Sequence, residues 1–419
     1  MKDREGAGRR VVVTGLGMVT PVGVGIDAFW GGVVTGKSGI KAVHSFDVSN
    51  FNTKIAGEVD DFIPTDYLDA KSVKRYDRFV HYAVAGARLA LADAGVKVEN
   101  EDCERFGTII GSGIGGMQTI YEQSWVFHEK SARYISPFMI PALIGNMASG
   151  IVAIELGVRG PNFGVVSACA SGTHAIGEAY HMLKLGKADI FLAGGSEAAV
   201  SPLSFAGFCA MKAMSTAFNS EPKRASRPFD AQRDGFVMSD GSGIIVLEEL
   251  EHAQRRGARI YCELVGYSAS CDAYHITSPD PEARGLAKCF RDLFLESGIG
   301  AHEVGYINAH GTSTKYNDKT ETKAISDVFG EHAKNLLVSS TKGTTGHLLG
   351  AAGGIEAAIC AKVIQTGVVP PTINYENPDP ECYLNYVPNQ AIERKIDVAI
   401  SDNLGFGGQN GALMFKRFE

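Results

Sequence analysis

The chain of 419 residues lacks clustered cysteines: its eight are scattered, with no Cys-x-x-Cys pair and no zinc-ligand spacing. This excludes a disulfide-dense secreted scaffold and predicts free thiols in a reducing compartment. The sequence also lacks an uninterrupted apolar run of about 18 residues. Residues 1–10 are polar, unlike a signal peptide. We therefore expect a soluble protein that is neither secreted nor embedded in a membrane.

An excess of positive charge is missing too. Lysine and arginine total 40 against 47 aspartates and glutamates, so the net charge is -7, the opposite of a nucleic-acid binder. No low-complexity linker divides the chain, which predicts one rigid unit of roughly two to three domains or one large architecture. Glycine is abundant, with 50 residues, and indicates many tight turns and close backbone contacts.

Short apolar runs alternate with glycine turns and helical patterns along the chain. They predict strands at 11–13, 106–110, 163–166, 190–193, 304–308, 336–339 and 398–400. This alternation favours an α/β fold whose strands are buried on both faces. Two of the runs lead into similar small-residue helices, expected at 169–187 and 346–367, which suggests an internal duplication. The two halves would meet near the charged stretch 248–259.

Two glycine motifs are similar to nucleotide-binding signatures. Gly31-x4-Gly36-Lys37-Ser38 fits the phosphate-binding loop letter for letter, but it follows a predicted helix at 27–34 instead of a strand. Gly111-x-Gly113-x-x-Gly116 does follow a strand, yet no acidic residue stands about 20 residues further on in a second strand. We interpret neither as a nucleotide site, and the second as a turn packed beside a cavity.

Cys169 is the first candidate for chemistry. The segment 167–172, Ser-Ala-Cys-Ala-Ser-Gly, joins an apolar strand to a helix, so the thiol should lie near the positive end of the helix dipole. A thiolate is stabilised there, and free amides can bind an oxyanion. The alternative is a small buried cysteine, which is the expected state of the other seven.

Two histidines are the next candidates. His310 lies at the mouth of a predicted strand and is followed by a glycine and three hydroxyl residues suited to a polar ligand. His347 opens a predicted helix, whose N-terminus would lower the imidazole pKa and keep the ring neutral as a hydrogen-bond donor. A thiol with two neutral donors differs from a cysteine-histidine-asparagine hydrolase. His174 and His181 have no carboxylate or cysteine companion, so no metal is expected there.

Two further segments surround these residues in the sequence. Asn317-Asp318-x-x-Glu321 begins a predicted helix, where these residues either cap the helix or supply a charge partner for Lys342. The segment 404–408, Leu-Gly-Phe-Gly-Gly, places one aromatic ring among glycines. It predicts a hinged gate whose backbone N–H can approach a ligand.

Taken together, these segments resemble the elongating β-ketoacyl-[acyl-carrier-protein] synthases. The similarity extends from residues 11–17, Val-Val-Val-Thr-Gly-Leu-Gly, to the glycine-rich segment 405–408. Further family-like stretches lie at 168–172, 225–230, 233–238, 308–314 and 346–353. The resemblance implies an α/β, thiolase-like fold of two duplicated halves in a five-layer α-β-α-β-α sandwich. Residues 1–258 would carry the nucleophile and residues 259–419 the two histidines.

The resemblance also implies a reaction. Cys169 would accept an acyl chain from acyl carrier protein, and His310 and His347 would donate hydrogen bonds to the malonyl thioester on a second carrier, stabilising the enolate formed as CO2 leaves. That carbon would attack the acyl thioester, whose oxyanion would sit on the backbone N–H groups of Cys169 and Phe406. The products would be β-ketoacyl carrier protein, CO2 and free carrier. No metal or redox cofactor is expected, because decarboxylation generates the carbanion.

Supporting residues follow from the same resemblance. Lys342 with Asp318 and Glu321 would form a charged network that fixes the histidines. Substrate contacts would come from Thr312 and Thr314 on the pantetheine arm and from Ile114, Phe208 and Phe406 around the acyl chain. Carrier docking would use Lys71, Lys74, Arg75, Arg133 and Lys212. Independently of the family, Lys71, Lys74, Arg75 and Arg78 have the spacing of one basic helical stripe, or of an ordinary solvated face.

Ile114 and Gly172 favour a type II synthase over type I. Residues 402–404, Asp-Asn-Leu, stand where Asn-Ser-Phe is usual, and residues 315–317, Lys-Tyr-Asn, replace a small or proline-glycine run, which leaves gating and chain-length preference open. The alternatives are a type I synthase, a polyketide ketosynthase, or a non-catalytic chain-length subunit, against which the intact Cys-His-His set argues. We expect an acyltransferase of fatty-acid biosynthesis that is a homodimer in the cytoplasm, or in a plastid stroma, without nucleic-acid or membrane partners.

Overall fold

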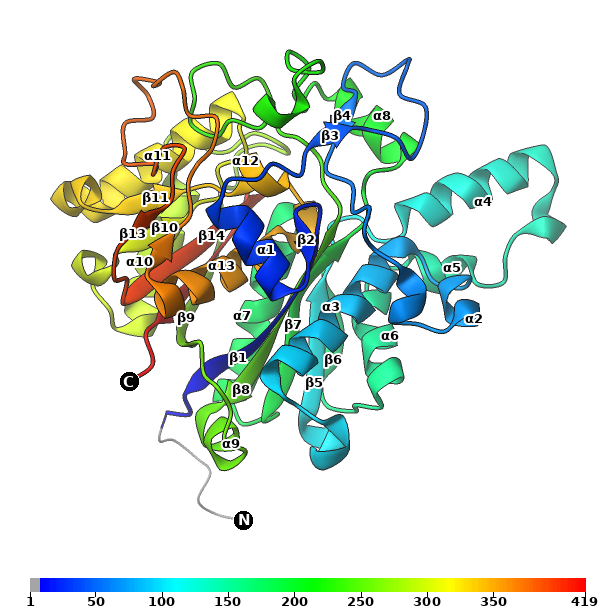
Figure 1. Ribbon diagram of the computed structural model, residues 1–419, viewed down its shortest axis with the longest axis horizontal. Helices are drawn as coiled ribbons and strands as arrows, with labels where there is room; N and C mark the ends of the chain where they lie inside the picture. Colours follow the sequence, from blue (N-terminus) through cyan, green and yellow to red (C-terminus); the bar gives the residue numbers. More distant parts are fainter. Residues whose placement is uncertain (1–7) are drawn as a thin grey trace.

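The computed structural model describes residues 8–419, in which eleven strands form one mixed sheet (Figure 1). Five strands of the first half lie side by side in the order β6-β5-β7-β8-β1. β5 is parallel to β6 and β7, and β8 is antiparallel to β7 and β1. Their bounds are β1 Val11–Thr20, β5 Phe106–Gly111, β6 Asn162–Val165, β7 Ile190–Glu197 and β8 Gly241–Glu249, and β2 (Gly23–Val24) pairs with the end of β1.

The second half repeats this arrangement strand for strand. Its order is β11-β10-β14-β15-β9, again with three parallel strands followed by two antiparallel ones. In both halves the third strand along the chain lies at the outer edge and the first strand at the centre, which confirms the predicted duplication. The bounds are β9 Cys262–Cys271, β10 Tyr306–Asn308, β11 Leu337–Ser339, β14 Val398–Gly405 and β15 Gln409–Lys416.

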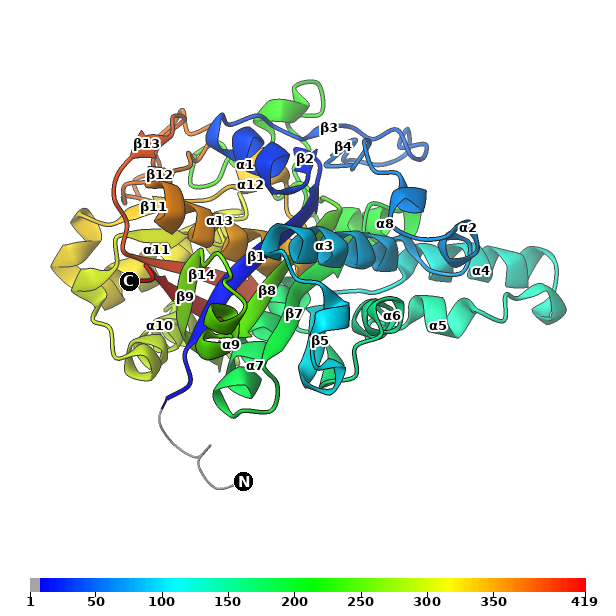
Figure 2. The same ribbon diagram turned by 60° about the horizontal axis from the view of Figure 1, so that its bottom comes forward.

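Helices occupy both faces of the two half-sheets (Figure 2). α7 (Ser171–Lys184) and α13 (Ala352–Thr366) form the middle layer, since α7 contacts β7 and β9, and α13 contacts β8 and β14. The outer layers are α3 (Arg78–Ala94) with α6 (Met147–Leu156) on the first half and α10 (Arg284–Ser297) with α11 (Lys315–Phe329) on the second. The expected five-layer α/β fold is therefore confirmed. The residue boundary between 258 and 259 stays a prediction.

Glycines let the layers approach closely. A Cβ atom at Gly17 of β1 would lie 1.9 Å from the carbonyl oxygen of Gly86 in α3, and one at Gly354 of α13 would lie 2.0 Å from the oxygen of Gly243 in β8. β1 therefore continues through its glycines to Thr20, whereas the sequence predicted a strand that stops at residue 13. The strand extends further because its glycines accommodate the backbone of a helix.

The remaining elements are short and lie around the sheet. α4 projects away from the body of the molecule in both views (Figures 1 and 2). None of the helices within residues 8–419 is long and apolar enough to span a lipid bilayer. The helices are α1 Ile26–Val34, α2 Ala70–Val73, α4 Met117–Glu129, α5 Met139–Leu143, α8 Pro202–Ala210, α9 Leu250–Arg255 and α12 Lys342–Thr345, and the short strand pairs are β3 Lys41–Ala42 with β4 Ile55–Ala56 and β12 Val368–Val369 with β13 Ile392–Glu393.

The structure shows where two of the sequence patterns lie, the phosphate-loop motif at 31–38 and the basic stripe at 71–78. Gly31 lies inside α1, so the phosphate-loop pattern lies on a helix and the loop after it, as predicted. The predicted basic stripe is wrong, because α2 ends at Val73 and a new helix, α3, begins at Arg78. Asp69 and Asp77 cap the two helices separately, so Arg78 does not continue the helix that carries Lys71.

Candidate active site

Cys169 lies on a short 3-10 turn, residues Ala168–Ala170, between β6 and α7. Its side chain is buried, with 8% exposed. The Phe406 segment packs against this turn, because a Cβ atom at Gly405 would lie 2.4 Å from the carbonyl oxygen of Ser167. The thiol is therefore placed at the entry to a helix, as predicted, with the glycine-rich segment of the second half beside it.

His310 follows β10, and a buried carboxylate holds its backbone. Glu321 of α11 accepts hydrogen bonds from the backbone N–H groups of His310, at 2.6 Å, and of Gly311, at 2.8 Å. The imidazole is buried and lines the same cavity as the thiol. Glu321 thus positions the histidine through the main chain.

His347 lies on an extended segment that bridges to Met238. Its N–H donates to the carbonyl of Val237 at 2.7 Å, and its carbonyl accepts from the N–H of Ser239 at 3.0 Å. The prediction that His347 opens a helix is wrong, since α13 begins only at Ala352. The extended pairing with Met238 places the ring, so a helix dipole is not the cause of its neutral state.

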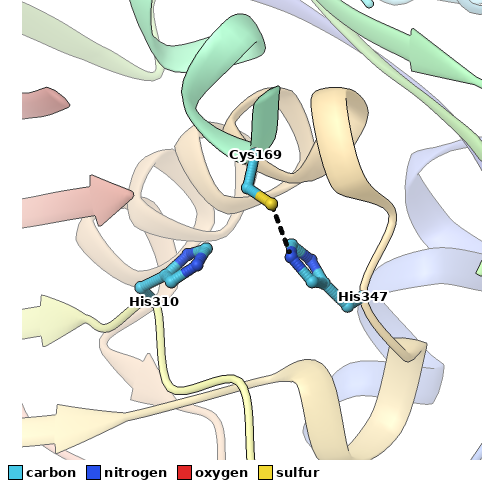
Figure 3. Close-up of side chains that lie close together, drawn as sticks. All are labelled: Cys169, His310 and His347. Atoms are coloured by element: carbon cyan, nitrogen blue, oxygen red, sulfur yellow. Dashed lines mark hydrogen bonds between the residues drawn. The ribbon is translucent and has the colours of Figure 1, made fainter. Parts of the chain in front are cut away.

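The three side chains converge in a buried cluster (Figure 3). Nε2 of His347 lies 3.1 Å from Sγ of Cys169, within hydrogen-bond distance for sulfur. The two imidazole rings have centroids 5.2 Å apart and are nearly perpendicular, at 84°. A thioester carbonyl entering this space would meet a sulfur nucleophile and two ring nitrogens at once.

Burial sets the protonation states of this cluster. Loss of solvent raises the pKa of the Cys169 thiol to about 12, although the charge of Lys342 acts in the opposite direction. The expected resting thiolate is therefore not favoured, because the cost of burying its charge exceeds the benefit from the turn. Burial, with the charge of Lys342, also holds the pKa values of His310 and His347 well below the usual range, so both rings are neutral at pH 7.

The buried charges near the histidines differ from the predicted network. Lys342 forms an ion pair with Glu356 of α13, a residue that the sequence analysis missed. Asp318 instead accepts a hydrogen bond from the backbone N–H of Phe229, at 2.8 Å, and lies 3.5 Å from Arg233. Asp318 therefore has direct partners other than Lys342, as does Glu321, which binds the backbone of the His310 loop.

Glu197 is a second buried carboxylate that the sequence analysis missed. It accepts from the backbone N–H of Gly113 at 2.6 Å and of Gly350 at 2.9 Å, and from the hydroxyl of Ser112 at 2.8 Å. Gly113 belongs to the first half and Gly350 to the second, so one side chain joins both halves beside Cys169. The 111–116 motif is a turn beside the cavity, as predicted.

The cluster opens into a cavity of about 540 Å³. Phe208 and Phe406 both line it and are neighbours, with ring centroids 6.4 Å apart. Of the predicted substrate and docking residues, the cavity is lined by Ile114, Phe208, Phe406, Thr312, Thr314 and Lys212. The other predicted docking residues do not line the cavity. Lys71 lies on α2, Lys74 and Arg75 follow that helix, and Arg133 lies on a short turn after α4. The guanidinium group of Arg75 lies 4.7 Å from the ring centroid of Phe138.

Sulfur and imidazole nitrogen are also ligands of zinc. The ligand atoms of Cys169, His310 and His347 lie within 4.8 Å of one another, the one such group of potential metal ligands among residues 8–419. The expectation that no metal takes part in the reaction stays a prediction.

Comparisons with known proteins identify the family to which this fold belongs. The model of the "Beta-ketoacyl synthase, N-terminal domain" matches residues 8–253, and that of the "Beta-ketoacyl synthase, C-terminal domain" matches residues 261–376. The chain therefore belongs to the β-ketoacyl synthase family, as the resemblance predicted.

Individual relatives indicate which type of β-ketoacyl synthase this chain resembles. The chain is 50% identical over 411 residues to the 3-oxoacyl-[acyl-carrier-protein] synthase 2 of Synechocystis, covering 98% of this chain and 99% of that one. It is 49% identical over 409 residues to the synthase 2 of Coxiella burnetii, with the same coverage. Among solved structures, the AntDE:AntF complex of a type II PKS acyl-carrier protein with its ketosynthase has a TM-score of 0.91 and 34% identity, covering 99% of this chain and 100% of that chain. The two sequence relatives are both named synthase 2, which confirms the predicted preference for a type II over a type I synthase.

The protonation state of Cys169 can be measured by alkylation. We expect the reaction with iodoacetamide to accelerate about tenfold per pH unit from about pH 7 to 10 without levelling off, because a thiol with a pKa of about 12 is only slightly ionised throughout this range. The rate is read from the Cys169 peptide by mass spectrometry, with the exposed Cys271 in the same digest as a reference for the reagent. A plateau near pH 8 to 9 would show that burial does not control this thiol.

Proposed function

We propose that Cys169 carries the acyl chain while His310 and His347 activate the malonyl unit that extends it. The activity is the one that the family and the near full-length relatives define: a condensation in fatty-acid elongation, catalysed by an acyltransferase of the 3-oxoacyl-[acyl-carrier-protein] synthase 2 type. The observation that carries the assignment of roles is the buried cluster in which a thiol lies 3.1 Å from one of two neutral imidazoles.

In the first stage the thiol attacks the thioester of an acylated carrier protein. Nε2 of His347 accepts the proton from Sγ as the C–S bond forms, and it returns the proton to the departing pantetheine thiol. The oxyanion is stabilised by the backbone N–H groups of Cys169 and Phe406, whose segments pack together at Gly405. The acyl chain then extends past Ile114 and Phe208, which line the cavity.

In the second stage malonyl carrier protein enters with its pantetheine arm beside Thr312 and Thr314. Both imidazoles donate N–H hydrogen bonds to the malonyl thioester carbonyl, where negative charge develops as the bond to the carboxylate breaks and CO2 leaves. The resulting carbon attacks the acyl thioester on Cys169 and expels the thiolate. Nδ1 of His347 has no hydrogen-bond partner in the described part of the chain, so this ring can change tautomer between acceptor in the first stage and donor in the second.

This assignment is tested by incubating the protein with an acylated carrier protein and malonyl carrier protein. A β-ketoacyl product two carbons longer, together with an intermediate in which the acyl mass is located on the Cys169 peptide, would support it. Elongation with the acyl group on a different residue would overturn the assignment of the nucleophile.

We propose that carrier protein docks on the basic side chains near the cavity mouth and on α2. Lys212 lies at the mouth, and Lys71 and Lys74 are exposed. Such basic side chains would steer an acidic carrier protein toward the cavity.

The double substitution Lys71→Glu with Lys74→Glu is expected to raise KM for the acyl carrier by about tenfold and leave kcat within about twofold, because rim charges act mainly on association. Steady-state kinetics at low and high salt measure this, and the defect should shrink at high salt. Lys97→Glu, at the opposite end of α3, is the control for a change of charge. An equal effect of Lys97→Glu would argue against a local docking surface.

We also propose that the chain forms a homodimer in a bacterial cytoplasm. β6 is an edge strand, and Val166, Ile144, Ile140 and Trp125 expose apolar side chains near it and on the projecting α4–α5 region. Unpaired strand edges and apolar patches of this kind are suited to contact with a second copy. Light scattering that gives the mass of one chain at micromolar concentration would contradict this.

A further inference from the structure

Among residues 8–419, Asn403 makes the one side-chain hydrogen bond to the imidazole of His310. Asn403 lies on β14, is fully buried, and was noted in the sequence only as a departure from the usual serine. Its Nδ2 lies 3.0 Å from Nδ1 of His310 and 2.7 Å from Oε2 of Glu356, and its Oδ1 accepts from the hydroxyl of Thr173. Asn403 therefore connects the His310 loop to α13 and α7.

The partners of Asn403 determine which way its amide points. A carboxylate oxygen only accepts hydrogen bonds, so the group that faces Glu356 is the NH2 and not the carbonyl oxygen. Glu356 is itself held as a carboxylate partner by the ammonium group of Lys342. The amide cannot turn over without placing its oxygen against that carboxylate.

The orientation of the amide fixes the tautomer of His310. Because the NH2 group also faces Nδ1, this ring nitrogen accepts a hydrogen bond and carries no proton. The single proton of the neutral ring is then on Nε2, the remaining nitrogen. Protonation of Nδ1 would bring two N–H groups together, so the same contact also opposes the charged form of the ring.

We propose that Asn403 is a positioning residue that keeps His310 as the Nε2–H tautomer, a permanent hydrogen-bond donor for the malonyl thioester carbonyl. This inference rests on the proposed roles of Cys169 and the two histidines. The two imidazoles then have different roles. Asn403 holds His310 as a hydrogen-bond donor. Nδ1 of His347 has no hydrogen-bond partner among the described residues, so that ring can first accept the thiol proton and later donate a hydrogen bond. Loss of Asn403 should therefore impair decarboxylation and spare acyl transfer to Cys169.

The test separates the two half-reactions in purified full-length protein. Asn403→Ala is expected to lower kcat for decarboxylation of malonyl carrier protein by about 10- to 100-fold, with KM within about twofold, and to leave acylation of Cys169 within about twofold. Asn403→Ser replaces the amide by a hydroxyl, which can also donate a hydrogen bond. Its rate of decarboxylation should therefore be within a few fold of wild type. Asn410→Ala, which removes another buried asparagine on the neighbouring strand β15, is the control for a loss of packing.

The tautomer itself gives a readout that a purely structural role would not change. In protein labelled with 15N-histidine, the wild type should show His310 with a protonated Nε2 and an unprotonated Nδ1, assigned by comparison with His310→Gln. Asn403→Ala should show a mixture of tautomers, because no amide donor then faces Nδ1. If Asn403→Ala does not fold, the wild-type spectrum still decides, since a protonated Nδ1 in the wild type would overturn the inference.

The kinetic outcomes also distinguish the inference from the function on which it rests. Unchanged decarboxylation in a folded Asn403→Ala variant, beside an active wild type, would overturn the role of Asn403 alone. Equal losses of acyl transfer and decarboxylation would show a general structural role and overturn it as well. Failure of the wild type to acylate Cys169 would contradict the proposed function instead.

Discussion

Replacing Cys169 by alanine is expected to abolish elongation, with a loss of about 10⁴-fold or more, because no second thiol lines the cavity to take over the acyl chain. Cys169 is the one cysteine among the residues that line the cavity of about 540 Å³. The substitution removes a small buried side chain, so the fold should persist with little loss of stability. Mass spectrometry of the carrier-bound products measures elongation directly.

The same variant should continue to decarboxylate malonyl carrier protein. His310 and His347 keep their positions without the thiol, since Glu321 holds the backbone of one and the extended pairing with Met238 holds the other. Release of CO2 without a lengthened product would therefore separate the two chemical roles. Cys209→Ala, in the same apolar cluster as Cys169, is the matched control and should elongate normally. Full elongation by Cys169→Ala would refute the covalent mechanism.

Replacing His347 by alanine is expected to impair both stages. Decarboxylation should fall by about 10²- to 10³-fold, the usual effect of removing one donor to a developing oxyanion. Acylation of Cys169 should slow by about tenfold or more, because Nε2 of His347 is the group at 3.1 Å that can accept the thiol proton. A thiol with a pKa of about 12 depends strongly on such an acceptor at neutral pH.

His310→Ala provides the comparison for this prediction. His310 is not hydrogen-bonded to the thiol in the structure, so its loss should slow decarboxylation and leave acylation nearly intact. Rapid-quench measurement of acyl-Cys169 and of CO2 release gives the two rates separately. His181→Ala, on the half-exposed face of α7, controls for the loss of an imidazole. Normal acylation in His347→Ala would exclude His347 as the proton acceptor.

The sequence predicted the parallel strands better than the antiparallel ones. Runs such as 106–110 and 190–193 are apolar without interruption because both faces of these strands are covered by helices. Three long antiparallel strands, β8, β9 and β15, show no such signal in the sequence. β8 and β15 begin with glycine and polar residues, and β9 mixes serine and glycine with apolar residues, so none begins as a plain apolar run.

The cluster of Cys169, His310 and His347 could be predicted because each of its members occurs in a recognisable local motif. Its supporting contacts could not. Glu197 meets Gly350, 153 positions away, and Asn403 meets His310, 93 positions away, and no local pattern marks either contact. The depth of burial was also not visible from the motif, and this is why the sequence favoured a thiolate at Cys169 where the structure favours a thiol.

The division of the site between two duplicated halves has a consequence for the newly made polypeptide. The N-terminal half, which contains Cys169, leaves the ribosome first. His310, His347 and Phe406 emerge later. β14 and β15, which place Asn403 and the Phe406 segment, are the last strands of the sheet to be synthesised. A nascent chain thus carries the thiol of Cys169 before the residues that surround it are made, so the proposed reaction with thioesters would begin only when translation is almost complete.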